Sequence, residues 1–297
     1  MTRVLVLKLL RDIRVAWIVV AVLLFLFQLL WSRITSRVTT EILPALQRAR
    51  LSLEFLQAIV LKPNEMMGQM VQAIIGGDSI ELDRPGDMMS ISYVHPLTLT
   101  ILCMWALGRA ANAIAGEIDR GTMELLLAQP IRRTQIILAH LAVDTIVFPC
   151  LCAAMWSGTY FGTLWMGLQD LEHGSIDPAR FLPALLCVSG LLFSVSGVTM
   201  GISSLGRSRA RVWGTAISLF LGMFLVNVLG QMWEDWLGWL RPFTIFYHYR
   251  PQGLIKNVDW LADGAIWFHL GVLLGVGVLG YLFAWLSFSR RDLPAPL

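Results

Sequence analysis

Charged residues are scarce in this chain. Of its 297 residues, 14% are Asp, Glu, Lys or Arg and 56% are hydrophobic, and the mean hydropathy is +0.66. Soluble globular domains carry roughly 25% charged residues. The composition therefore excludes an ordinary soluble domain and indicates an integral membrane protein. The net charge is only +3, and no nucleic-acid partner is expected.

Lysine is scarcer still, and its positions limit the chemistry of the chain. It occurs only at Lys8, Lys62 and Lys256, each preceded by leucine or isoleucine. A Walker loop needs a lysine directly after a glycine, because that lysine and the backbone amides hold the phosphates. The His-Glu-x-x-His and Gly-x-Ser-x-Gly motifs are also missing from the sequence. We therefore expect no ATPase site in this chain and no enzymatic activity.

The few cysteines point in the same direction. Cys103, Cys150, Cys152 and Cys187 all lie within apolar segments. Neither a disulfide framework nor a metal site is expected from this placement.

Long apolar runs dominate what remains. A helix needs about 20 apolar residues to cross the hydrocarbon core of a bilayer. Six transmembrane spans are predicted, at residues 16–31, 94–115, 135–165, 181–204, 212–232 and 265–287. The expected fold is therefore all-α, a single transmembrane domain over residues 1–297. Glycine and serine are frequent in 181–204, as is glycine in 265–287, which predicts close helix packing there.

Basic residues gather on one face of this arrangement. Of the 23 Lys and Arg, 13 lie in or beside the N-terminal segment, the 116–134 loop, the loop before 212 and the tail 288–297. The positive-inside rule places these segments and both termini in the cytoplasm. Residues 1–15 are expected to form an amphipathic helix on the membrane surface.

The opposite face carries two longer polar segments. Residues 32–93 are expected to be external and to include an amphipathic helix over 41–60. The aromatic segment within 233–263 is expected to lie at the membrane interface or to dip into the membrane and return. Candidates for an outer gate there are Trp233, Trp236, Phe243 and Phe246. Interfacial anchoring is the favoured role for most of the aromatic residues between Trp233 and Tyr249.

Three ionisable residues are predicted inside the membrane. Arg109 lies near the inner end of the second span, and His140 and Asp144 share one helical face of the third. Such groups are costly in lipid and usually face protein or water. An ion pair between Arg109 and Asp144 that ties the two spans together is the favoured interpretation. A cluster that responds to protons or substrate is the alternative.

The stretch GEIDRGTMELLLAQPIRR (116–133) interrupts the apolar pattern. Its apolar centre, 123–128, would extend only about 9 Å as a helix, too short to cross a bilayer. Thr122 is a candidate N-cap and Pro130 a stop signal. The face with Met123, Leu126 and Leu127 is expected to bury in a partner or against the bilayer.

The same stretch resembles the coupling-helix region of ABC transporter permeases of the second exporter type. These six-span proteins are related to the bacitracin-resistance, sodium-extrusion and nitrous-oxide-reductase maturation permeases. The residues that carry the resemblance are Glu117, Arg120, Gly121, Thr122, Glu124, Leu126, Pro130 and Arg133. With Asp119 they are the candidate residues for coupling to a separate ATPase subunit. The ending FSRRDLP (288–294) is also similar to the family pattern. The 32–93 region is longer than the minimal family pattern, so its role stays open.

The resemblance implies that ATP hydrolysis and transport are carried out by two different subunits. A separate nucleotide-binding subunit would bind ATP and Mg, and this chain would hold no cofactor. Two copies of each chain would form the working unit in a bacterial-type inner membrane. Closure of the ATPase subunits would push residues 116–130 and move substrate outward along the interface between the two membrane chains. Residues 233–250 would match the re-entrant helices that narrow the outer mouth.

Two other functions are compatible with the sequence. A secondary transporter could use protons carried by His140 and Asp144, although no internal repeat is visible in the sequence. A scaffold that does not transport could instead recruit an external partner through residues 32–93. The sequence does not indicate the substrate.

Overall fold

The computed structural model describes residues 2–48, 84–170 and 174–291, and every regular element among them is a helix. Six helical stretches in this part of the chain are long and apolar enough to cross a membrane. They are Arg3–Ala45, Pro85–Asp119, Arg133–Trp165, Pro178–Leu205, Arg209–Met232 and Gly264–Arg290. The prediction of an all-α, multi-pass membrane protein is confirmed.

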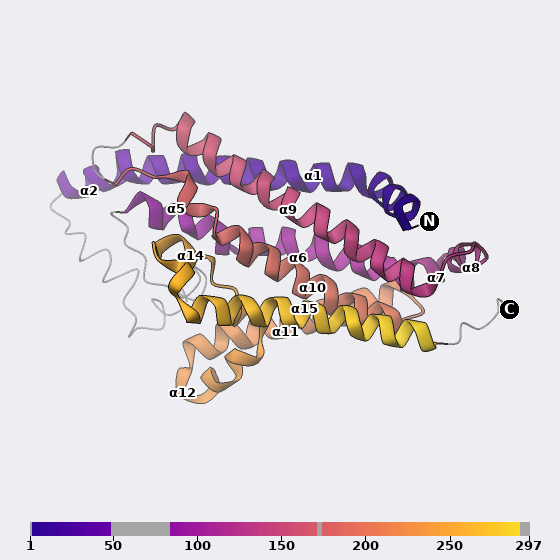
Figure 1. Ribbon diagram of the computed structural model, residues 1–297. Coiled ribbons are helices and arrows are strands. Elements are labelled where there is room, and N and C mark those ends of the chain that lie inside the picture. Colours follow the sequence, from indigo (N-terminus) through magenta and orange to yellow (C-terminus); the bar gives the residue numbers. More distant parts are fainter. Residues whose placement is uncertain (1, 49–83, 171–173, 292–297) are drawn as a thin grey trace.

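The helices form an elongated bundle (Figure 1). Its long members are α1 (Thr2–Arg37), α6 (Pro96–Ala111), α9 (Arg133–Trp165), α10 (Ala184–Leu205), α11 (Arg209–Met232) and α15 (Gly264–Arg290). The short elements before α9 are η1 (Val38–Ile42), α2 (Leu43–Arg48), α5 (Pro85–Val94), η2 (Asn112–Gly116), α7 (Glu117–Asp119) and α8 (Thr122–Leu127). Those after it are η3 (Pro178–Phe181), α12 (Glu234–Leu237), η4 (Gly238–Phe243), α13 (Ile245–His248), α14 (Pro251–Lys256) and η5 (Trp260–Ala262).

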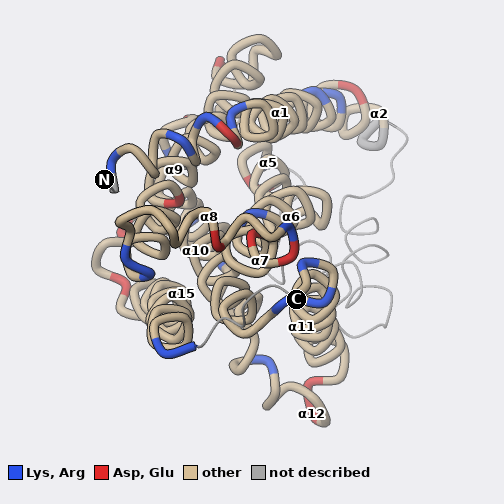
Figure 2. Tube along the Cα trace, turned by 90° about the vertical axis from the view of Figure 1, so that its right-hand side faces the viewer, with Lys and Arg blue, Asp and Glu red and all other residues tan. Residues whose placement is uncertain are grey.

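The start of α1 and the end of α15 lie at the same end of the bundle, together with α7 and α8 (Figure 1). We call this the terminal end, and the end with α2 and α14 the distal end. Figure 2 looks onto the terminal end and shows Lys and Arg at the ends of several helices there. The four basic segments of the sequence therefore share one end of the molecule.

Two helix boundaries differ from the sequence prediction. The expected surface helix 1–15 is continuous with the first span, because no glycine or proline interrupts residues 2–37. Near its start, Leu5 is buried in a core cluster with residues of α9 and α15. The second span is preceded by α5, which begins at Pro85 rather than near residue 94. The predicted 41–60 helix lies largely outside the described residues.

Glycines allow the closest helix contacts, as their frequency predicted. A Cβ added to Gly197 of α10 would collide with the backbone of Gly277 on α15. Ser194 adds a hydrogen bond from its hydroxyl to the Leu273 carbonyl at 2.5 Å. On the other side of the bundle, a Cβ on Gly158 of α9 would come within 2.5 Å of the Phe25 carbonyl of α1. The pairs α10–α15 and α1–α9 are the most extensive helix contacts.

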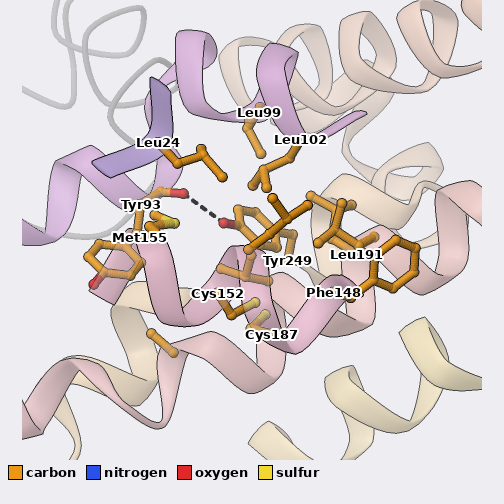
Figure 3. Close-up of a cluster of buried hydrophobic side chains, with 14 of the residues drawn as sticks. Leu24, Tyr93, Leu99, Leu102, Phe148, Cys152, Met155, Cys187, Leu191 and Tyr249 are labelled. Carbon is orange, nitrogen blue, oxygen red and sulfur yellow. Dashed lines mark hydrogen bonds between the residues drawn. The ribbon is translucent and has the colours of Figure 1, made fainter. Parts of the chain in front are cut away.

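The main core lies between α1, α6, α9 and α10 and also receives the distal segment. Figure 3 shows Leu24, Leu102, Phe148 and Leu191 around Tyr249. The Tyr249 hydroxyl donates to the Tyr93 carbonyl at 2.6 Å. This bond fastens the segment after α13 to the end of α5.

Candidate functional site

The α7–α8 segment projects from the terminal end of the bundle (Figure 1). We call residues 117–130 the tip. The tip holds almost all of the residues that carry the resemblance to the coupling region. Three sets of contacts give it a fixed shape: a turn between its two helices, a buried apolar side, and bonds to the neighbouring spans.

The turn is built around the Glu117 carboxylate. Arg120 donates Nη2–H to Oε1 at 2.5 Å, and the Thr122 hydroxyl donates to Oε2 at 2.5 Å. Between them, Gly121 has φ of 70°, in the left-handed region that glycine enters without steric cost. The prediction that Thr122 caps α8 is wrong, because Gly121 occupies the N-cap position and the Thr122 hydroxyl turns back to Glu117. The Glu-x-x-Arg-Gly-Thr motif is thus a self-contained turn.

The apolar side of α8 faces the protein itself. Met123 is only 2% exposed and belongs to a cluster with Ala110, Ile136 and Phe288. Leu126 and Leu127 pack against the same cluster. The expectation that this face buries in a partner or in the bilayer is therefore wrong for Met123, which the protein itself buries, while Leu126 and Leu127 are partly covered by the same cluster. The side chain that α8 presents outward is Leu125, which is 70% exposed, with Glu124 beside it.

The tip also contacts the spans on either side of it. The Asp119 carboxylate accepts a hydrogen bond from the backbone N–H of Arg209, the first residue of α11, at 3.3 Å. Helix α8 ends at Leu127, before Pro130, and α9 begins at Arg133. The Gln135 side chain accepts from the Arg132 N–H at 3.0 Å and so caps the start of α9. The tip is held between the ends of α9 and α11.

Two arginines fasten the terminal end. Arg133 donates Nη1–H to the Phe288 carbonyl at 3.2 Å and to the Arg291 carbonyl, and its guanidinium lies 5.7 Å from the centre of the Phe288 ring. Arg291 donates Nη1–H to the carbonyls of Ser204 and Gly206, at 2.7 and 2.9 Å. These bonds satisfy carbonyl groups that helix ends leave free. Sequence reasoning placed Arg291 in the tail motif but missed its role, because it bonds residues 85 and 87 positions away.

A buried polar cluster lies deeper in the bundle. Arg109 of α6 pairs through Nε with Asp144 Oδ1 and donates Nη2–H to the His140 carbonyl at 2.7 Å. The second carboxylate oxygen accepts from Ser196 of α10 at 2.7 Å and from Tyr281 of α15. Asp144 is 0% exposed. A single carboxylate therefore joins α6, α9, α10 and α15, and both of its oxygens have donors.

The predicted members of this cluster have unequal roles. The ion pair between Arg109 and Asp144 is the one that the sequence favoured. His140 contributes its backbone carbonyl, while its Nδ1 has no hydrogen-bond partner among the described residues. Sequence reasoning missed Ser196 and Tyr281. Each is an ordinary residue in an apolar span, and no local pattern connects either of them to Asp144.

The distal aromatic residues separate into two groups. Trp236 and Phe243 are 83% and 76% exposed, and Trp233 is about half exposed. Phe246 is buried against Phe224 of α11, with ring centres 5.5 Å apart. The structure therefore does not bring the four gate candidates together.

A histidine pair lies beside these aromatic residues. The Nδ1 atoms of His248 and His269 are 2.8 Å apart, and His248 Nε2 is 2.9 Å from the Pro242 carbonyl. Burial lowers the pKa of His248. The Pro242 carbonyl raises this pKa and the nearby Arg250 lowers it, each by less than the effect of burial. His248 is thus neutral at neutral pH and fastens α13 to α15.

One comparison with known proteins matches nearly the full length of the chain. A family model described as "ABC-2 family transporter protein" matches residues 8–293. No curated protein matches the sequence. The matched range contains the tip, the two fastening arginines and the buried polar cluster.

Proposed function

The chain belongs to the ABC-2 transporter family, and we propose that it is the membrane-spanning half of an ATP-driven exporter. Permeases of this family act with a separate ABC ATPase subunit. In the proposed complex that subunit binds ATP and Mg, and two copies of each chain form the working unit. The proposal also includes the nearer resemblance to bacitracin-resistance, sodium-extrusion and nitrous-oxide-reductase maturation permeases.

The outward face of α8 is the observation that carries the proposal. Leu125 is exposed on a projecting helix whose other apolar residues are buried, in the case of Met123, or partly buried, in the case of Leu126 and Leu127. Grooves on soluble proteins bind short helices through such apolar side chains. Leu125 and Glu124 form a small contact surface that a groove on the ATPase subunit would cover. The turn at Glu117 keeps this surface in one orientation.

In the proposed complex, contacts between the tip and the membrane spans transmit a displacement of α8 into the bundle. Met123 packs with residues of α6, α9 and α15, and Asp119 bonds the first residue of α11. A push on α8 therefore acts on four spans at once. Asp144 joins three of these spans to α10, about two helical turns beyond Ile136 along α9.

The proposed orientation follows from charge. The terminal end carries the basic segments, so the positive-inside rule places it in the cytoplasm, where an ATPase subunit can reach the tip. The distal end then faces outward, with Trp233, Trp236 and Phe243 at the outer mouth or among lipid headgroups.

The occupied carboxylate disfavours proton-driven transport. A proton carrier in a membrane must gain and lose its proton during the cycle. Both oxygens of Asp144 accept hydrogen bonds from Arg109, Ser196 and Tyr281. Asp144 is also fully buried, so a proton would have to displace one of these donors inside the bundle to reach the carboxylate.

A pair of leucine variants tests the proposal. Leu125→Ser removes the apolar contact of the tip, whereas Leu205→Ser alters another exposed leucine at the terminal end of the bundle. We expect Leu125→Ser, and deletion of residues 121–128, to reduce co-purification of the ATPase subunit and its stimulated ATP hydrolysis. Leu205→Ser should change neither. Unchanged co-purification and ATP hydrolysis in both tip variants would exclude coupling through α8.

A further inference from the structure

An apolar groove of about 310 Å³ lies between α9 and α15. Its walls include Leu138 and Leu141 of α9 and Leu282 of α15, and Phe193 of α10 also contributes. Leu138 and Leu282 remain exposed in the membrane-spanning part of the chain. The medium that surrounds these leucines in a membrane is hydrocarbon, so an acyl chain can enter the groove without losing contact with apolar surface.

Tyr281 connects the inner wall of the groove to the buried polar cluster around Asp144. The Tyr281 ring lines the groove and stacks on Phe193, with centres 5.5 Å apart and an interplanar angle of 20°. Its hydroxyl points the other way, to Asp144 and Ser196. A molecule in the groove therefore contacts one side of a ring whose other side holds the polar cluster together.

The end of the groove nearest the terminal end of the bundle is polar, and two arginines directly precede it in the chain. Trp285 donates its indole N–H to the Thr134 hydroxyl at 3.1 Å, which joins the two helices at that end. The next residues along the chain toward the terminal end are Arg133 and the exposed Arg132. Among the described residues, Arg133 makes hydrogen bonds only through Nη1, which leaves Nε and Nη2 as donors for another acceptor.

We propose that this groove binds an anionic phospholipid, with one acyl chain along α9 and α15 and its phosphate at Arg132 and Arg133. Charge complementarity selects this occupant, because an apolar groove that ends at two arginines matches an acyl chain that ends at a phosphate. The bound lipid contacts the Tyr281 ring and so stabilises the carboxylate cluster from outside the bundle. The inference does not depend on the ATPase subunit.

Photolabelling of the purified full chain tests this site. The probe is phosphatidylglycerol with a diazirine on one acyl chain, present at a low fraction in phosphatidylcholine vesicles. We expect labelling at Leu138, Leu141 and Leu282 to exceed severalfold that at Val22 and Leu23, which face outward from α1. Unlabelled phosphatidylglycerol should compete with the probe, and phosphatidylcholine should not.

Two variants and a control sharpen the test. Leu282→Trp fills the groove and should reduce labelling of α9 about tenfold, or about 1.4 kcal/mol of binding free energy. Leu279→Trp adds the same bulk at an exposed position outside the groove lining and should leave labelling unchanged. Arg132→Gln should remove the preference for the anionic lipid without changing the fold.

Three outcomes would overturn the proposal. In the first, the probe labels Val22 and Leu23 of α1 as strongly as the groove. In the second, phosphatidylcholine competes with the probe as well as phosphatidylglycerol does. In the third, a Leu282→Cys variant forms disulfide-linked dimers, which would show that a second copy covers the groove. Each result concerns lipid binding by this chain alone. A failure of lipid binding is therefore distinguishable from a failure of coupling at Leu125.

Discussion

Thr122 donates its hydroxyl hydrogen to the Glu117 carboxylate, 2.5 Å away and five residues earlier in the chain. The other oxygen of the same carboxylate accepts from Arg120. The three side chains close the turn at Gly121 and set the direction of α8 relative to α7. A motif that resembles a partner-binding sequence therefore has an internal role, which is to aim the exposed Leu125.

Loss of the Glu117 charge should uncouple the tip without unfolding the chain. Glu117→Gln weakens both hydrogen bonds, and because Glu117 and Arg120 are partly exposed we expect a cost of only about 0–1 kcal/mol. ATP hydrolysis stimulated by the membrane chain should fall severalfold, while the melting temperature in detergent stays nearly constant. Asp12→Asn removes an exposed carboxylate from α1, outside both the turn and the contact surface on α8, and serves as the control. An equal loss of activity in both variants would show that the loss of any nearby acidic charge, rather than of the fixed turn, lowers the activity.

The buried carboxylate should matter chiefly for stability. Asp144→Asn leaves Arg109 buried without its counter-charge, and removal of one partner of a buried pair costs about 3–5 kcal/mol. We expect a clear fall in melting temperature but retained transport per correctly assembled molecule. Thermal unfolding in detergent and vesicle transport assays measure the two quantities separately.

Tyr281→Phe provides the matched comparison for that prediction. It removes one donor from Asp144 but leaves Arg109 in place. The expected cost is about 1–3 kcal/mol, less than that of Asp144→Asn. Abolished transport in an Asp144→Asn protein that assembles normally would show that the carboxylate acts in the transport cycle.

Local signals predicted much of the fold. The six spans could be predicted because each is a long apolar run. The ion pair between Arg109 and Asp144 could be predicted because charged residues are rare in such runs. Helix α5 was missed because Ser90 and Ser92 lower the apolar character of its sequence. In the fold the Ser92 hydroxyl donates to the Gln28 side chain of α1 at 2.7 Å, which satisfies its polarity inside the bundle.

The remaining parts of the site depend on contacts between distant residues. Ser196 and Tyr281 reach Asp144 across 52 and 137 positions, so no spacing rule identifies them. The apolar face of α8 posed a different difficulty. A six-residue amphipathic helix shows which residues are to be buried, but its sequence does not say whether its own protein or a partner buries them. In the structure the protein itself buries Met123 and partly covers Leu126 and Leu127.

The two neighbouring arginines of the tail should behave differently. Arg291→Gln removes the bonds to the Ser204 and Gly206 carbonyls, whereas Arg290→Gln changes an exposed side chain in the last turn of α15. The loss of two charge-assisted bonds should loosen the end of α10 by about 1–3 kcal/mol. Amide hydrogen exchange of residues 202–206 should accelerate in the Arg291 variant only. Equal protection in both variants would mean that other contacts hold this end of α10.

Close packing of α10 on α15 can be tested with a matched pair of glycines. A methyl group at Gly197 would collide with the backbone of Gly277, which cannot move as a flexible side chain would. Gly271 of α15 has open space around its Cα, so Gly271→Ala should be tolerated. We expect Gly197→Ala to destabilise the chain by about 1–3 kcal/mol, because overpacking forces the two helices apart. It should also weaken the Ser194 bond to the Leu273 carbonyl, one turn away. Thermal unfolding of both variants in detergent measures the difference, and equal melting temperatures would show that α10 and α15 do not pack this closely.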